Sequence, residues 1–478
     1  MNNNININSV ITSNYKILFI TFSNFIINYL MSLFLIKLLA PSDFGIINLI
    51  NSTLEFFLFM HSFRFDQLYY SRNGFSKEIE RFNYIFLRIT SILIGFILFL
   101  IFHPIIIKQY NVPDNILNIF IIYFFLRTIN ATATIFVLEQ TQQMKRYKFE
   151  FFNGICAIIG NLFAILLAYY GFGYKSLIAK AIISNILIFI ISYFLFKIKI
   201  SFSLKLPIIK WYLKKGMYLF LNNYINIISN KIDDLFIGYG ISQKILGLYG
   251  RSFQIAILPG MLITDNIIAN NYPIFIKYKN DKPKINKIMK LLIDSVIIAN
   301  SLLLMNILIF LPFLIINFFG LQWENIYYYT IGFIFFSLGG GVIKIIYNYM
   351  VAIDKIKDLN KIYISYAIIN LLLISAGFFT YKTWGIIIAQ NLTTFCIIIY
   401  MIFYNKLPWS YIKTLIISFL GLNMIFTILI NFSSNFSLKV LITNFIIGNL
   451  AYLFFITIFN FNNIKELLNV LKNKKLSI

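Results

Sequence analysis

Long apolar runs separated by short polar stretches fill almost the whole chain. A transmembrane helix needs about 20 mostly apolar residues, and fourteen runs of about that length can be marked along the sequence. Irregular backbone cannot face lipid, so each run is predicted to be helical. The predicted spans are 17–40, 45–63, 84–106, 115–137, 151–170, 174–195, 217–238, 245–273, 289–318, 327–352, 361–380, 384–404, 411–431 and 437–460. The pattern therefore predicts an all-α integral membrane protein.

Basic residues are concentrated in every second connection between these spans. The even-numbered connections and the two tails carry most of the basic residues outside the spans. The odd-numbered connections carry only Lys37, Lys108, Lys175, Lys244, Lys382 and Lys439. Loops rich in Lys and Arg stay on the cytoplasmic side. Both termini are therefore predicted to be cytoplasmic.

The composition supports this assignment and narrows the function. The chain has 478 residues, of which 59% are hydrophobic and 12% charged, with a formal net charge of +24. Soluble domains carry about 25% charged residues. The basic loops explain the net charge through topology and contact with anionic lipids, so no nucleic-acid partner is expected. The sequence has no phosphate-binding loop, and it indicates no cofactor or metal site.

Two stretches of the chain resemble each other. Residues 37–48 (KLLAPSDFGIIN) and 239–250 (YGISQKILGLYG) each join two predicted spans through a short polar turn. They align on Gly45 and Gly247, an offset of 202 residues. We therefore expect two six-helix lobes, residues 1–200 and 217–405, joined by a basic cytoplasmic linker, 201–216. Residues 406–478 would add two extra helices and a tail.

These stretches also resemble a known family. LLAPSDFGIINLINS, at 38–52, is similar to the first hairpin of polysaccharide-biosynthesis flippases in the multidrug/oligosaccharidyl-lipid/polysaccharide exporter superfamily. NKIDDLFIGYGISQKILGLYGRSFQIAILPGML, at 230–262, resembles their seventh and eighth helices. NNYPIF at 270–275 and YNYMVAIDKIKD at 347–358 fall where the family has comparable segments. The chain most resembles the Wzx-type flippases of O-antigen or capsule repeat units.

The resemblance implies a function as well as a fold. It implies a bacterial inner-membrane protein, not an enzyme, that moves an undecaprenyl-diphosphate-linked oligosaccharide from the cytoplasmic to the periplasmic leaflet by alternating access coupled to an ion. The expected partners are this lipid-linked substrate, membrane lipids, and a glycan polymerase with its assembly proteins. Two alternatives stay open. One is a drug or metabolite exporter on the same fold, although an exporter of cations should have an acidic cavity. The other is a membrane glycan polymerase, which the short outer loops disfavour.

Charged residues inside the predicted spans are the candidate site, because a charge in hydrocarbon must be paired or face water. Arg127 lies at the midpoint of its span, and a guanidinium can bind a diphosphate through two parallel hydrogen bonds. Lys180 and Lys344 can add charge to the same cavity or tether helices. Glu55 lies about 15 Å inside its span at 1.5 Å per residue. It is a candidate for ion coupling or a structural hydrogen-bonded carboxyl.

A second charged group lies around 231–251. Lys231 and Asp234 are three residues apart, so they can pair on one helix face. Asp233 points to another side and is expected to pair with Arg251. The resemblance places Arg251 at the family's basic position, where it can contact pyrophosphate. Two further acidic residues complete the set: Asp265 has no evident partner, and Asp294, near a cytoplasmic helix end, is expected to reach the interface.

Overall fold

The computed structural model describes residues 7–58, 63–71, 76–109, 116–143, 145–196, 198–268, 275–276, 278–279, 281–432 and 438–472. In this part of the chain the regular structure is entirely helical. Ten helices are long and apolar enough to cross a membrane. Each of the fourteen predicted spans falls on a helix, so the predicted number is compatible with the structure.

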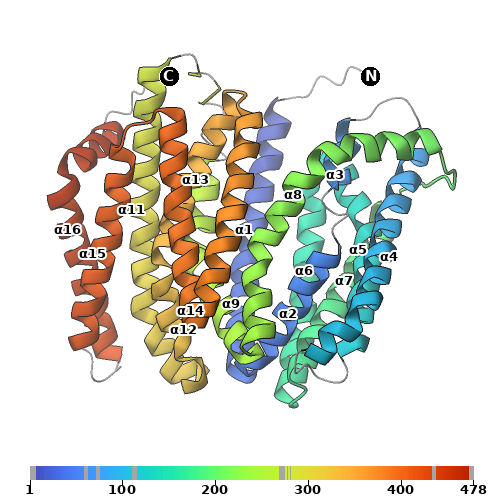
Figure 1. Cartoon of the computed structure of the whole chain (residues 1–478), viewed down its shortest axis with the longest axis horizontal. Coiled ribbons are helices and arrows are strands. Elements are labelled where there is room, and N and C mark those ends of the chain that lie inside the picture. The colour runs from blue at the N-terminus through green and yellow to red at the C-terminus, as the bar shows by residue number, and fades with distance from the viewer. Residues whose placement is uncertain are drawn as a thin grey trace. The chain divides into compact units, whose positions relative to one another are not determined.

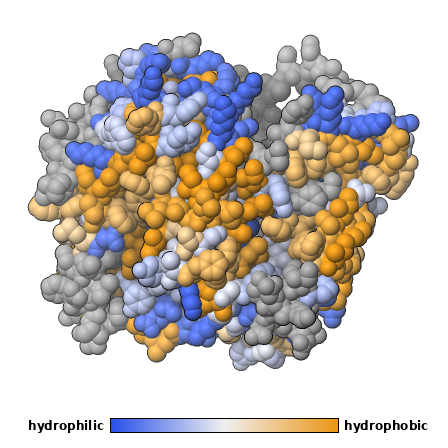
Figure 2. Space-filling view, viewed as in Figure 1, coloured by the Kyte–Doolittle hydropathy of each residue, from blue (hydrophilic) through white to orange (hydrophobic). Residues whose placement is uncertain are grey.

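The chain forms two compact units, residues 1–247 and 248–478 (Figure 1). In each unit, hydrophobic side chains cover the middle of the visible helices and hydrophilic ones gather toward their ends (Figure 2). A water-soluble protein would show the reverse, with charged side chains along the outward helix faces. The chain is thus an all-α multi-pass membrane protein.

In the described residues of the first unit there are eight helices and the start of a ninth. They are α1 (Ile7–Leu38), α2 (Pro41–Phe57), α3 (Phe65–Ser71), α4 (Lys77–Gln109), α5 (Ile116–Gln142), α6 (Arg146–Tyr169), α7 (Tyr174–Phe196), α8 (Leu206–Gly240) and α9 (Gln243–Pro259). Helix α6 packs against α1 and α7, and α2 packs against α8. Ile50 and Leu54 of α2, one turn apart, are fully buried against Phe99 of α4 and Phe120 of α5. The opposite side of α2 is therefore left to its polar residues.

The quoted motif PSDFG shapes the beginning of α2. Pro41 starts the helix, where its missing N–H is not needed. The Asp43 carboxylate accepts hydrogen bonds from the backbone N–H of Ala40 at 2.9 Å and of Tyr174 at 2.8 Å. It thereby fixes both the start of α2 and the start of α7.

Gly45 and Gly247 mark a close crossing of α2 and α9 in the first unit. A Cβ on Gly45 would lie 1.7 Å from the carbonyl oxygen of Gln243, and one on Gly247 would lie 1.8 Å from that of Pro41. Pro41 and Gln243 are separated by the same 202 residues as the two glycines. The contact is therefore reciprocal under the offset of the sequence repeat, as in a two-fold interface.

The second unit is built around one long buried helix. Its elements are the rest of α9, the π-helical turn η2 (Gly260–Thr264), α11 (Lys282–Leu314), η3 (Ile315–Phe319), η4 (Leu321–Trp323), α12 (Asn325–Gly332), α13 (Ile334–Ala352), α14 (Ile356–Asn405), α15 (Ser410–Phe432) and α16 (Leu438–Lys472). Ile293, Ile297, Leu304 and Leu308 of α11 follow the helical period and are almost completely buried. Helix α11 packs against α13, α15 and α16.

The helices differ in detail from the predicted spans. Helix α8 begins at Leu206, eleven residues before the predicted span, because Ile208 and Tyr212 are buried one turn apart; much of the predicted linker is thus helical. Spans 361–380 and 384–404 form two arms of α14, which bends at Tyr381 and Lys382. Directly after Pro259, α9 continues into the π-helical turn η2.

Candidate functional site

The polar side of α2 carries the main charged group of the first unit. Nη2 of Arg127, on α5, lies 2.7 Å from Oε1 of Glu55. The two side chains are 28% and 26% exposed. Arg127 is within a candidate membrane span (Leu117–Gln142). An exposed charge at such a position must face water or a partner, and here each charge has the other as a partner.

A second charge pair lies one turn away on the same side of α2. The Ser52 hydroxyl donates a hydrogen bond of 2.7 Å to Oδ2 of Asp234 on α8. The same oxygen is 3.4 Å from Nζ of Lys231. Ser52 and Glu55 are three residues apart and therefore share a helix face. Helix α2 thus contacts two ion pairs: Glu55 forms one with Arg127 of α5, and Ser52 donates to the other, which lies within α8. The Lys231–Asp234 pair is the one that their spacing predicted.

Two other sequence-derived candidates lie in the first unit. Asp233 is 5% exposed on α8. Lys180 is half-buried on α7, and its backbone carbonyl lies close to Gly160 of α6. Both side chains take part in further interactions. Their predicted roles stay predictions.

The second unit holds the remaining candidates on α9 and α13. Nζ of Lys344 lies 2.6 Å from Oδ1 of Asp265, and the side chains are 46% and 49% exposed. Asp265 directly follows the π-helical turn, and this pair supplies the partner that the sequence did not reveal. Arg251 donates a hydrogen bond of 2.8 Å to Oε1 of Gln254. The proposed contact between Asp233 and Arg251 joins residues of different units and stays a prediction.

The expectation for Asp294 is wrong. Its side chain is 1% exposed on α11, and Oδ1 accepts a hydrogen bond of 2.6 Å from the Thr414 hydroxyl of α15. A buried carboxylate with a bound donor does not reach the membrane interface. Asp294 instead helps to fasten α15 to α11, and the paired amides of Asn306 and Asn449 join α11 to α16.

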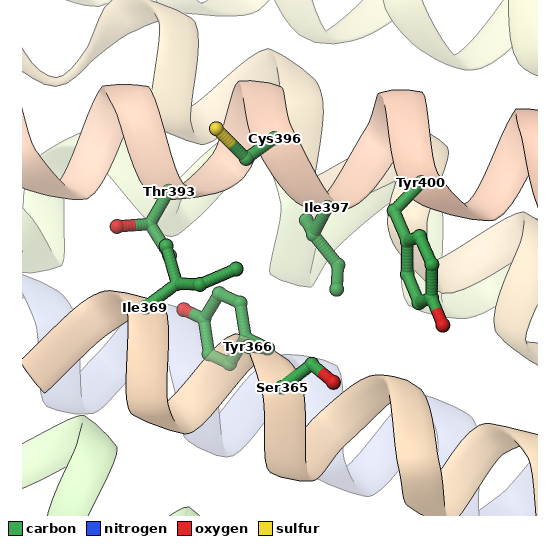
Figure 3. A pocket seen from close by; sticks show the side chains of 7 residues that line it. All are labelled: Ser365, Tyr366, Ile369, Thr393, Cys396, Ile397 and Tyr400. Atoms are coloured by element: carbon green, nitrogen blue, oxygen red, sulfur yellow. The ribbon is translucent and has the colours of Figure 1, made fainter.

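Two cavities, one in each unit, differ in the charge of their lining. In the second unit, a cavity of about 310 Å³ lies between the two arms of α14, lined by Ser365, Tyr366, Ile369, Thr393, Cys396, Ile397 and Tyr400 (Figure 3). It contains no charged side chain. In the first unit, a cavity of about 750 Å³ is lined by Lys16, Lys145 and Lys148 beside aromatic residues. Among the described residues, no group of three or more metal-ligating side chains comes together.

The family model for polysaccharide biosynthesis proteins matches residues 34–328, which is more than half of the chain. The chain belongs to this family. The match includes the α2 hairpin, Arg127 and the α8–α9 hairpin, and it ends within α12. No curated protein matches the chain in sequence.

Two solved structures share its fold. The lipid II flippase MurJ, in an inward closed conformation, is similar with a TM-score of 0.71 and 17% identity, over 94% of this chain and 99% of that one. An inward-facing multidrug resistance MATE family transporter of the MOP superfamily is similar with a TM-score of 0.51 and 14% identity, over 80% of this chain and 94% of that one. At these identities the likeness shows the fold alone. The family assigns the chain to the polysaccharide biosynthesis proteins, and the fold is the multi-pass helical fold of MurJ and the MATE transporter.

Proposed function

We propose that this chain moves an undecaprenyl-diphosphate-linked oligosaccharide, an O-antigen or capsule repeat unit, from the cytoplasmic to the periplasmic leaflet by alternating access. The observation that carries the proposal is the Arg127–Glu55 ion pair, which is about one quarter exposed inside apolar helices. A guanidinium has five N–H donors, and the bond to Glu55 uses only one of its nitrogens. Arg127 therefore keeps donors with which to receive a phosphate.

The same pair offers a way to couple transport to an ion. A diphosphate that binds Arg127 competes with the Glu55 carboxylate for one guanidinium. A carboxylate left without its partner in a low-dielectric site is costly. Glu55 then takes up a proton or a metal cation, and releasing that ion restores the Arg127 pair and expels the phosphate. Lys231 and Asp234, on the adjacent face, can repeat the exchange with a second phosphate.

The remaining predicted contacts belong to the same proposal. Arg251 and Lys344 of the second unit, and Lys180 of α7, would contact the diphosphate at other stages of the cycle. Asp233 would hold or release Arg251. The substrate partner is thus an amphiphile with an anionic centre, and the protein acts on it without chemical change.

Export of glycan to the cell surface tests the proposal. Arg127→Ala should abolish export with normal protein in the membrane, and undecaprenyl-linked repeats should accumulate in the cytoplasmic leaflet. Arg127→Lys should restore export only partly, because an ammonium keeps the charge but cannot form the bidentate hydrogen bonds of a planar guanidinium. Glu55→Gln should slow export and abolish its dependence on the coupling ion.

The matched control is Lys279→Ala. Lys279 forms an ion pair with Asp354 at 3.6 Å, but the two side chains are 40% and 83% exposed. Its loss should leave export unchanged, since exposed pairs contribute little. Full export by Arg127→Ala would refute the proposal. Export of cationic drugs that needs Glu55 but no lipid-linked glycan would favour the drug-exporter alternative.

A further inference from the structure

The basic cavity of the first unit that Lys16, Lys145 and Lys148 line has no role in the mechanism above. It has a volume of about 750 Å³, which is within the usual range of ligand sites. Its walls come from the beginning of α1, the end of α5, the beginning of α6 and the end of α7. All these helix ends lie on the basic side of the predicted topology. The cavity is therefore at headgroup level.

The charge in this cavity differs from the charge inside the spans. Lys16, Lys145 and Lys148 line it, and among the described residues of its lining there is no carboxylate. The nearest carboxylates along the chain are engaged elsewhere: Glu139 by Arg81 at 2.8 Å, and Glu150 by Arg146 at 2.9 Å. The three ammonium groups thus form an uncompensated positive site, whereas Arg127 is neutralised by Glu55.

The rest of the lining suits an amphiphile. Gln140 and Gln143 supply amide donors and acceptors beside the lysines. Phe151, which is 50% exposed, forms an apolar part of the lining together with Leu195 and Phe196 at the end of α7. The Lys16 ammonium lies 5.3 Å from the centre of the Tyr147 ring, a cation–π contact that links α1 to α6 in the lining of the cavity.

We infer that this cavity is a loading site that captures the diphosphate of a polyprenyl-linked glycan at the membrane surface before the substrate reaches Arg127. The lysines bind the phosphates, Gln140 and Gln143 contact the first sugar, and Phe151 contacts the first isoprene units. The inference rests on the proposed function and adds a capture step to it. Capture precedes exchange because a neutral ion pair attracts an anion only at short range, whereas three unpaired cations attract it from about a Debye length, about 8 Å.

Binding of geranylgeranyl diphosphate to the purified protein tests the inference directly. This short polyprenyl diphosphate is soluble enough for calorimetry in neutral detergent. Each lysine near a phosphate surface contributes about a fivefold gain in affinity. The triple variant Lys16→Gln, Lys145→Gln and Lys148→Gln should therefore bind about a hundredfold more weakly. The matched control Lys210→Gln, Lys214→Gln and Lys215→Gln removes the same charge from exposed positions of α8 and should change binding less than threefold.

A second variant separates the apolar contact from the charge. Phe151→Ser should weaken binding of geranylgeranyl diphosphate but leave inorganic pyrophosphate binding unchanged. Equal loss in both triple variants, or no loss in either, would overturn the inference. So would equal affinity for pyrophosphate and the prenyl compound. Competition by phosphatidylglycerol as strong as that by the prenyl diphosphate would assign the cavity to membrane phospholipid instead.

Export measurements keep this inference distinct from the proposed function. The lysine triple variant should slow glycan export at low substrate supply, and raising the supply should restore it, because only capture is weakened. Arg127→Ala should stay inactive at every supply while still binding the prenyl diphosphate. A wild-type protein that exports no lipid-linked glycan contradicts the proposed function. A wild-type exporter whose triple variant binds and exports normally contradicts the loading site alone.

Discussion

The reciprocal glycine crossing of α2 and α9 gives a quantitative prediction. In Gly45→Ala, the new Cβ would lie 1.7 Å from the Gln243 carbonyl oxygen, whereas real Cβ atoms essentially never come within 3.0 Å of such an atom. The two helices must separate by about 1.3 Å, since the obstacle is backbone and cannot rotate away. Overpacking of this kind costs about 3 kcal/mol. Alanine regains about 1 kcal/mol of helix propensity, so a net loss of about 2 kcal/mol is expected.

Because the contact is reciprocal, the second substitution should cause little further loss of stability. Gly247→Ala alone should also cost about 2 kcal/mol, because its Cβ would meet the Pro41 carbonyl at 1.8 Å. Once one alanine has moved the helices apart, the other gains the space it needs. The double variant should therefore be no less stable than either single variant, a coupling of about 2 kcal/mol.

Unfolding of the purified protein by sodium dodecyl sulfate in mixed micelles, followed by circular dichroism, measures these differences. Gly340→Ala is the matched control, because no atom lies within 4 Å of a Cβ at this position of α13; it should be neutral or stabilising by up to about 1 kcal/mol. A Gly45→Ala protein with the wild-type midpoint, or strictly additive losses in the double variant, would refute the close crossing.

Three shorter predictions follow from the charges and the repeat. Asp233→Arg or Arg251→Asp alone should abolish export or reduce the level of protein in the membrane, and the double swap should recover much of the loss; no recovery at normal levels argues against the pair. Thr414→Val should lower stability by about 1–3 kcal/mol, because it removes a donor from the buried Asp294 carboxylate; an unchanged unfolding midpoint would show that this bond is dispensable. In an experimental structure, the first six helices should superpose on the seventh to twelfth about an axis along the membrane normal, with Gly45 falling on Gly247; unrelated positions of the first and seventh helices would contradict the repeat.

The fold was largely predictable because hydrophobic length is a local signal. Each predicted span needed only its own 20 or so residues. The start of α8 was misplaced because it depends on packing against other helices and not on a local signal. Lys205 and Lys210 make residues 201–216 look like a linker, but Ile208 and Tyr212 pack into the first unit and extend the helix to Leu206. Burial by other helices is a tertiary effect that hydropathy does not contain.

The contacts of the candidate residues were only partly predictable from the sequence. Lys231 and Asp234 were paired correctly, because both lie on one helix and the helical period decides which residues meet. Arg127 and Glu55 come from different helices, so their pairing depends on how α2 and α5 pack. The basic cavity was missed for a similar reason. Lys16 and Lys148 belong to segments far apart in sequence, and each segment alone looks like an ordinary basic loop.

The pairing of intramembrane charges also predicts how many ions would be taken up for each glycan that is transported. In the described part of the chain, Arg127 and Lys231 each have a carboxylate partner within 3.4 Å, so the empty site carries little net charge and is inexpensive to keep in a low-dielectric region. Under the proposed function, an arriving diphosphate would upset that balance by displacing a carboxylate from its cation. Neutrality returns only if each displaced carboxylate binds one proton or cation. The number of ions taken up per glycan should therefore equal the number of carboxylates displaced: one if the phosphates engage Arg127 alone, and two if they also engage Lys231.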